Sequence, residues 1–142
     1  MAVNRKRTRK LLFQELYAKK FNKFDEKEFY SSFYDWKFTF SIDKPYIQEI
    51  SIIISEKKDF FNTIVKKFAP KFDLDSMSVI YLIPIYIALS EMFFLKEEIP
   101  AKVSINEAIE VTKTYWDDSW KKIVNWILNK VLENYEELKK KI

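Results

Sequence analysis

Five basic side chains lie within six positions near the start of the chain, where they could bind phosphate groups. They are Arg5, Lys6, Arg7, Arg9 and Lys10. An arginine guanidinium can donate two hydrogen bonds at once to a phosphate, and the N–H groups at the start of a helix also attract anions. The cluster is therefore a candidate contact for an RNA backbone. The alternative interpretation is a solvated basic tail without a ligand, which composition alone favours equally.

The positive charge of the chain is concentrated at this end. Residues 1–24 contain eight lysines and arginines and one acid, a net charge of +7, whereas the whole chain of 142 residues carries +4. The remainder is therefore net acidic, at −3. Local basicity of this kind favours binding to a phosphate backbone.

A second candidate site is the turn at residues 114–123, which is rich in aromatic and basic side chains. Single-stranded RNA is bound by stacking bases on aromatic rings beside positive charge, at about 1–3 kcal/mol per base. The side chains concerned are Tyr115, Trp116, Trp120, Lys121 and Lys122, with Asp118 as an acceptor for a base edge. The alternative is a corner between two helices, with its aromatic rings packed inward and an aspartate capping the next helix.

Composition argues against an enzyme. The chain has no cysteine, histidine or glycine, so thiolate metal sites, the commonest general base and the glycine-rich phosphate loops are all missing. The close acid pairs Asp73/Asp75 and Asp117/Asp118 are interpreted as caps and turns. We therefore expect no catalytic residue, no metal and no cofactor.

The pattern of apolar residues predicts an all-α protein of about seven helices in one compact domain, residues 1–142, with a basic arm at about 1–10. Residues 99–110 are interpreted as a loop, a cap and the start of the first of the last two helices. There, Pro100 ends the preceding helix and Ser104 with Glu107 forms a capping box. The expected helices cover about residues 7–22, 29–38 after an Asp25–Glu28 cap, 45–68 with a break near 56–58, an apolar stretch ending near Leu95, 105–115 and 119–138.

The apolar run Val79–Leu89 contains Pro84 and is too short to span a bilayer. A buried core helix is the better interpretation of this run. The basic N-terminus leads into an amphipathic helix instead of an apolar signal-peptide region, so we expect a cytoplasmic protein without membrane contact.

Three segments carry a resemblance to a known family. Residues 99–110 resemble the I-P-x-x-V-x-I-N-E-A-I-E segment of the bacterial transcription antitermination factor family NusB. Residues 7–17 resemble that family's opening R-x-A-R-x-x-A-x-Q-x-L-Y helix, and residues 122–128 resemble its K-F-V-N-G-V-L segment. The order and spacing of the segments agree over nearly the whole chain.

This resemblance implies a fold of two helical subdomains and a function in assembly instead of catalysis. The family binds a short single-stranded RNA element, boxA, through its arginine-rich N-terminus and through the positions of Tyr115, Asp118, Lys122 and Ile123. It acts with NusE, a small-subunit ribosomal protein, in the RNA polymerase antitermination complex, and some members form homodimers. Glu91, Asn106 and Glu107 lie in or beside the helices that help to dock NusE in the family.

Two other functions stay open at this point. One is a detached RNA-positioning module of an rRNA methyltransferase system, and the other is a helical adaptor that does not bind RNA. Trp116 and Trp126 also fall where the family carries glycine. Either the lineage repacked both corners, or both codons are UGA, read as glycine in the source organism.

Overall fold

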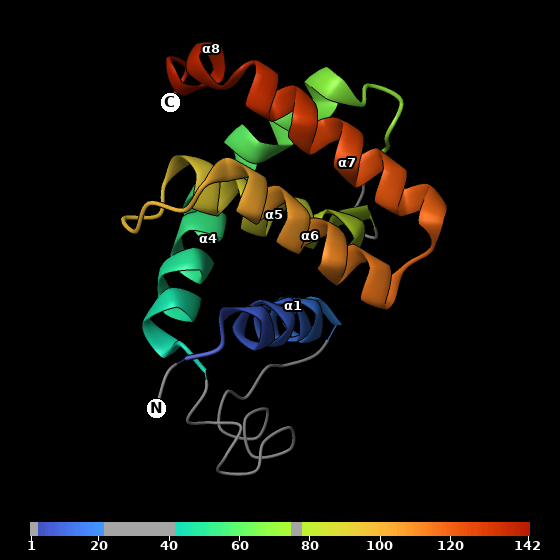
Figure 1. Ribbon diagram of the computed structural model, residues 1–142. Helices are drawn as coiled ribbons and strands as arrows, with labels where there is room; N and C mark the ends of the chain where they lie inside the picture. Colours follow the sequence, from blue (N-terminus) through green and yellow to red (C-terminus); the bar gives the residue numbers. More distant parts are fainter. Residues whose placement is uncertain (1–2, 22–41, 75–77) are drawn as a thin grey trace. The chain divides into compact units, whose positions relative to one another are not determined.

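The computed structural model describes residues 3–21, 42–74 and 78–142. Within these ranges the chain forms six α-helices and no strand, which confirms the all-α prediction (Figure 1). The chain divides into two compact units, Met1–Gln48 and Glu49–Ile142. The helix expected at residues 29–38, with its Asp25–Glu28 cap, lies outside the described residues.

Two helix starts in the first unit are capped by short polar side chains. Helix α1 is Arg5–Phe21, and Asn4 caps it, because the Oδ1 atom of Asn4 accepts a hydrogen bond of 3.0 Å from the Arg7 N–H. Helix α4 is Lys44–Phe68, and the Oδ1 atom of Asp43 accepts a hydrogen bond of 3.2 Å from the Tyr46 N–H. The break expected near residues 56–58 is wrong, since α4 is continuous there.

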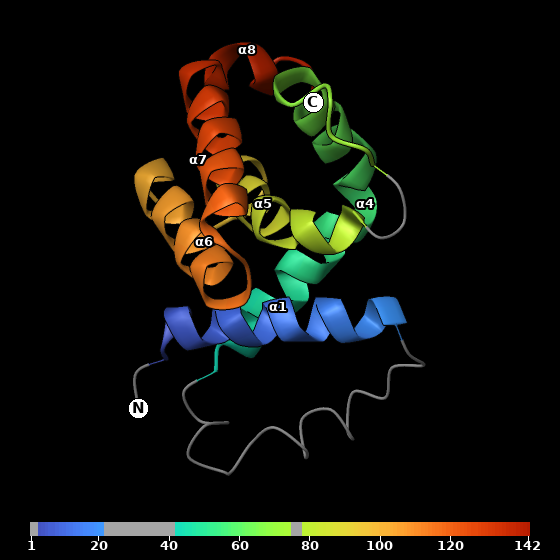
Figure 2. The same ribbon diagram turned by 90° about the vertical axis from the view of Figure 1, so that its right-hand side faces the viewer.

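The second unit contains the rest of α4 and four further helices. These are α5 (Ser78–Phe93), α6 (Ala101–Tyr115), α7 (Asp118–Glu133) and the short α8 (Tyr135–Lys139). Helix α7 runs back alongside α6, and α5 packs against both (Figures 1 and 2). The helices meet over fully buried aliphatic side chains, among them Leu82, Ile85, Leu89, Val124, Ile127 and Leu128. Each such burial contributes about 1.5–3 kcal/mol to folding.

Aromatic rings join α4, α5 and α8. The rings of Phe61 and Tyr86 stack with centroids 5.9 Å apart, and those of Phe93 and Tyr135 stack at 4.9 Å. The Tyr86 hydroxyl donates a hydrogen bond to the Asn62 side-chain oxygen. Burial raises the pKa of Tyr86 to about 12.

The start of α6 corrects one sequence prediction. The helix begins at Ala101, with Pro100 as its N-cap and no side-chain cap, so Ser104 and Glu107 do not form a capping box. The Ser104 side chain lies inside the helix, is buried, and donates a hydrogen bond of 2.9 Å to the Glu91 carboxylate. A tertiary partner thirteen residues earlier in the chain therefore replaces the expected local one.

The predicted final helix, residues 119–138, is divided in two at Asn134. The Asn134 side-chain amide donates a hydrogen bond of 2.8 Å to the Lys130 carbonyl, and its backbone N–H also bonds to carbonyls of the last turn. Asparagine competes in this way with the helical hydrogen-bond pattern and ends α7.

Trp116 and Trp126, which stand where the family carries glycine, do not require an unusual backbone conformation. Trp116 ends α6 in extended conformation, with φ −135° and ψ 176°, and no described residue has positive φ. Trp126 projects from the surface of α7 and is 53% exposed, so its indole does not separate packed helices. The described backbone therefore accommodates both side chains.

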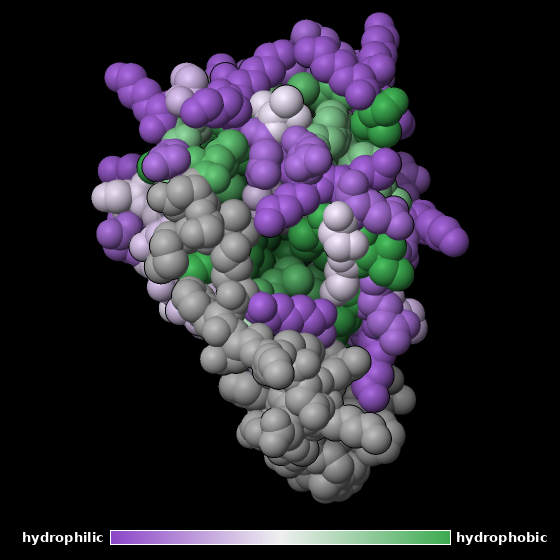
Figure 3. Space-filling model, turned by 180° about the vertical axis from the view of Figure 1, so that it is seen from behind, coloured by the Kyte–Doolittle hydropathy of each residue, from purple (hydrophilic) through white to green (hydrophobic). Residues whose placement is uncertain are grey.

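The surface of the molecule reflects this packing. On the face seen in Figure 3, most of the projecting side chains are hydrophilic, and a hydrophobic area lies in a hollow near the centre, with further hydrophobic groups at the edge. Among the described residues, no helix is both long enough and apolar enough to span a bilayer.

Candidate nucleic-acid interface

Helix α1 places the five basic side chains of the N-terminal cluster on different faces, some exposed and some not. Lys6, Arg7 and Lys10 are exposed. Positions three and four apart are neighbours on a helix surface, so these three side chains share one face of the first two turns. This face lies at the N-terminus of α1, where the helix dipole adds to the positive potential.

The other two arginines of the cluster have structural roles. Arg5 makes an ion pair of 2.9 Å with Asp43, and its guanidinium lies 4.3 Å from the centroid of the Tyr46 ring. Arg9 is only 4% exposed. Arg5 is therefore half-buried and held by these contacts, whereas Arg9 is removed from solvent. Arg9 lies three and four positions before the buried Leu12 and Phe13, and this spacing was the available signal.

The turn between α6 and α7 is organised by the two aspartates. Asp117 is the N-cap of α7, and its side chain accepts a hydrogen bond of 3.1 Å from the Trp120 N–H. Asp118 is exposed and lies 3.7 Å from Lys121, an exposed ion pair of small energetic weight. The capping role predicted for one aspartate is therefore filled by Asp117.

Only part of the aromatic set in this turn is accessible. Trp120 is 7% exposed, and its indole N–H donates a hydrogen bond of 2.9 Å to the Tyr81 carbonyl, so it belongs to the core. Trp116 is half-buried, with its ring centroid 5.3 Å from that of Tyr81. Tyr115 is exposed.

Lys122 and Ile123 are exposed at the start of α7. Sequence reasoning did not include Trp126, which lies three and four positions after these two residues and therefore on the same face of α7. Its exposure is the largest of any aromatic side chain that the structure describes. The helical spacing was sufficient to find it.

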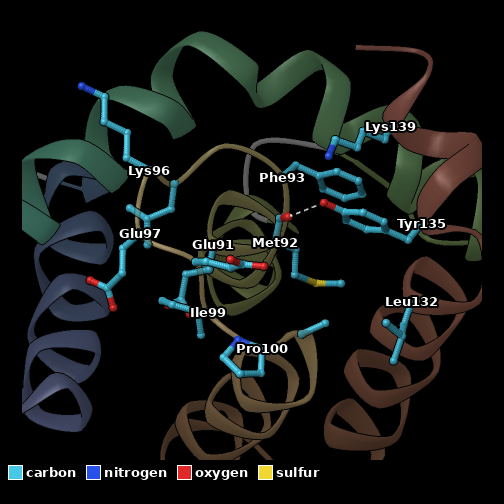
Figure 4. A pocket seen from close by; sticks show the side chains of 13 residues that line it. Glu91, Met92, Phe93, Lys96, Glu97, Ile99, Pro100, Leu132, Tyr135 and Lys139 are labelled. Atoms are coloured by element: carbon cyan, nitrogen blue, oxygen red, sulfur yellow. Dashed lines mark hydrogen bonds between the residues drawn. The ribbon is translucent and has the colours of Figure 1, made fainter.

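A cavity of about 870 Å³ lies where α5, the loop after it, α7 and α8 meet (Figure 4). Glu91 lines this cavity, although it is 4% exposed and hydrogen-bonded to Ser104. The Tyr135 hydroxyl donates a hydrogen bond of 3.0 Å to the Met92 carbonyl at its wall (Figure 4). Asn106 is exposed and Glu107 is half-buried, and neither lines the cavity.

The described residues contain no group of histidine, cysteine, aspartate or glutamate able to hold a metal ion. Asp73 is exposed, and Asp75 lies outside the described residues.

The chain belongs to the NusB family, whose sequence pattern it matches over residues 6–133. It is 30% identical to the transcription antitermination protein NusB of Clostridium perfringens over 136 residues, which are 94% of this chain and all of that protein. It is also 30% identical to the transcription antitermination protein NusB of Lactiplantibacillus plantarum, covering 94% of this chain and 98% of that one.

A solved structure of T. maritima NusB supports the same assignment. It superposes with a TM-score of 0.70 at 28% identity, covering 94% of this chain and 93% of the other. The family consists of non-enzymatic transcription antitermination factors. Family membership therefore confirms the predicted fold and the absence of enzymatic activity, and it gives the chain a role in transcription antitermination.

Proposed function

We propose that this chain binds boxA-type single-stranded RNA in nascent transcripts, in the cytoplasm and together with NusE. The RNA–NusE assembly would join the RNA polymerase antitermination complex and help the polymerase to resist termination. Membership of the NusB family supports the class of function. The observation that carries the RNA contact is the exposed face of Lys6, Arg7 and Lys10 at the start of α1.

The cationic face is suited to the RNA backbone in particular. Lysine and arginine side chains release counterions when they neutralise phosphates, and this release gives a large part of nucleic-acid affinity. The sugar–phosphate backbone is the same in every sequence. Contacts by Lys6, Arg7 and Lys10 therefore supply affinity and orientation with little sequence preference.

The second region supplies contacts to bases. Tyr115 presents a ring, Lys122 a charge and Asp118 a carboxylate acceptor on the exposed side of the α6–α7 turn. Ile123 offers an apolar surface but no stacking ring. Bases of single-stranded RNA are unstacked and can meet such side chains directly, so this region is the source of sequence preference.

The NusE contact is assigned to the surface around the α5–α6 junction. Glu91 lines the cavity of about 870 Å³ there, and Asn106 and Glu107 follow on α6. A partner bound at this surface adds its own RNA contacts to the same assembly. The effective concentration of the second contact then raises the affinity of the whole assembly.

A fluorescence anisotropy titration tests the proposal. A labelled boxA-like RNA and a scrambled RNA of the same length are compared, each with and without NusE. The expected result is tighter binding of the boxA-like RNA and a further gain on adding NusE. Equal, weak binding of both RNAs without any effect of NusE would contradict the proposal and favour a helical adaptor.

A further inference from the structure

An apolar groove of about 570 Å³ lies between the C-terminal end of α4 and the exposed face of α7. The segment Phe68–Phe72 forms one side of it, and Lys122, Ile123 and Trp126 form the other. All of these residues belong to the second unit, Glu49–Ile142. The two lysines that line the groove, Lys71 and Lys122, are both exposed.

Trp126 is held in place although it is exposed. Its indole N–H donates a hydrogen bond of 3.0 Å to the Phe68 carbonyl across the groove. The Lys130 ammonium lies 4.6 Å from the ring centroid, a cation–π contact. An exposed ring that is already fixed loses little conformational entropy when a ligand stacks on it.

The opposite wall of the groove is also firmly supported. The ring of Phe72 packs on that of Trp120 with centroids 5.0 Å apart. Trp120 is buried and hydrogen-bonded to the Tyr81 carbonyl, so it connects this wall to the core. The groove is therefore a preformed aromatic site.

We propose that this groove binds one nucleobase of the single-stranded RNA, stacked on Trp126, with the flanking phosphates near Lys71 and Lys122. The assignment rests on the proposed RNA-binding function and adds a base-binding site to it. A nucleobase combines a flat π-face with flanking negative charge, and the groove combines an aromatic ring with flanking positive charge.

Charge complementarity favours RNA over a second copy of this chain. Lys71 and Lys122 take part in no ion pair among the residues that the structure describes, so their charges are available to phosphate. The chain itself carries a net charge of +4, which disfavours pairing two copies across a lysine-flanked surface. The groove is also continuous with Lys122 and Ile123, which belong to the proposed RNA contact.

The test uses the full chain and a boxA-like RNA in which each base in turn is replaced by the fluorescent base 2-aminopurine. One position should be quenched on binding to the wild-type chain and not on binding to the Trp126→Ala variant. Trp126→Ala should weaken RNA binding about 5-fold to 150-fold, as expected for one stacked base, and Trp126→Phe should retain most of the affinity. Val103→Ala, at an exposed site on α6, is the matched control and should change nothing.

Removing the aromatic ring and removing the two lysine charges should have different effects on the salt dependence of RNA binding. Trp126→Ala should leave the salt dependence of RNA binding unchanged. Each phosphate contact contributes about 0.7 to the slope of log K against log salt, so Lys71/Lys122→Ala, which removes two contacts, should reduce this slope by about 1.4. Thermal unfolding of each variant reports whether its fold is retained.

Two results would overturn the base site while leaving the proposed function intact. One is wild-type affinity and an unchanged quenching pattern in Trp126→Ala. The other is a change of oligomeric state in Trp126→Ala, measured by sedimentation, with no change in RNA binding, which would make the groove an interface between copies. A wild-type chain that binds no RNA would overturn both the base site and the proposed function.

Discussion

The Ser104 hydroxyl donates a hydrogen bond of 2.9 Å to the Glu91 carboxylate, and both side chains are buried. This contact connects the first turn of α6 to the last turns of α5, the two helices that flank the candidate NusE surface. A buried polar group without its partner costs about 1–3 kcal/mol. The pair therefore fixes the geometry of this junction.

We expect Ser104→Ala to lower the free energy of unfolding by about 1–3 kcal/mol, because a buried carboxylate loses a hydrogen bond. Urea unfolding followed by circular dichroism measures the change. The matched control is Ser55→Ala, since the Ser55 hydroxyl is exposed and bonds only to the Ile52 carbonyl of its own helix. The control should change stability by less than about 0.5 kcal/mol. Equal effects of the two substitutions would contradict this account.

A second prediction concerns Asp43, which both pairs with Arg5 and caps α4. Asp43→Ala should lower stability by about 1–2 kcal/mol, chiefly through loss of the cap. Asp43→Asn keeps a cap acceptor and should cost less. A double-mutant cycle with Arg5→Ala, measured by urea unfolding, should give a coupling below about 1 kcal/mol for this partly exposed pair. Zero coupling would show that the ion pair between Arg5 and Asp43 contributes nothing to stability.

A third prediction follows from Tyr86, whose pKa is raised from 10.0 to about 12 in the folded chain. Below pH 10 the hydroxyl is protonated in both the folded and unfolded states and adds no pH dependence. Between pH 10 and 12 only the unfolded state ionises, so stability should fall with rising pH by up to about 1.4 kcal/mol per unit.

Replacement of Tyr86 by phenylalanine removes this contribution. The shift of the Tyr86 pKa sets the range for urea unfolding at pH 9–12. As the pH rises through this range, the stability of the wild type should fall relative to that of Tyr86→Phe. Tyr115→Phe, at an exposed tyrosine, is the control and should follow the wild type. Parallel curves for the wild type and Tyr86→Phe would contradict the prediction.

A fourth prediction concerns the codons for Trp116 and Trp126. The backbone at Trp116 is extended and the Trp126 indole lies on the surface, so tryptophan is accommodated at both positions. We therefore expect UGG at both codons in the gene. UGA at either position, in an organism that reads it as glycine, would contradict this prediction, and UGA at codon 126 would also remove Trp126 from the proposed base site.

The elements of this fold could largely be predicted from apolar periodicity, and the errors have identifiable causes. The last helix was predicted as continuous because its apolar stripe extends through Leu138, whereas a side-chain hydrogen bond of Asn134 ends α7. The Ser104–Glu107 spacing matches a capping box, but the same spacing occurs inside helices. The true partner of Ser104 lies on another helix, and local pattern does not reveal such a tertiary contact.

The candidate site was predicted less completely than the fold. Residue type identified the basic cluster, but only helix phase separates the exposed Lys6, Arg7 and Lys10 from the buried Arg9. Trp120 has the residue type expected for base stacking, yet its indole N–H is satisfied inside the core. The groove beside Trp126 depends on the segment after α4, which is more than fifty residues away in sequence and could not be placed from the sequence.

The most direct test of the central claim is the salt dependence of boxA-like RNA binding, compared between the wild type and Lys6/Arg7/Lys10→Ala. Each phosphate contact on a single strand contributes about 0.7 to the slope of log K against log salt, so the slope should fall by about 2. The control Lys102/Lys140/Lys141→Ala removes three exposed charges elsewhere and should keep the wild-type slope. If all three proteins gave the same slope, the exposed face of α1 would not be the RNA contact.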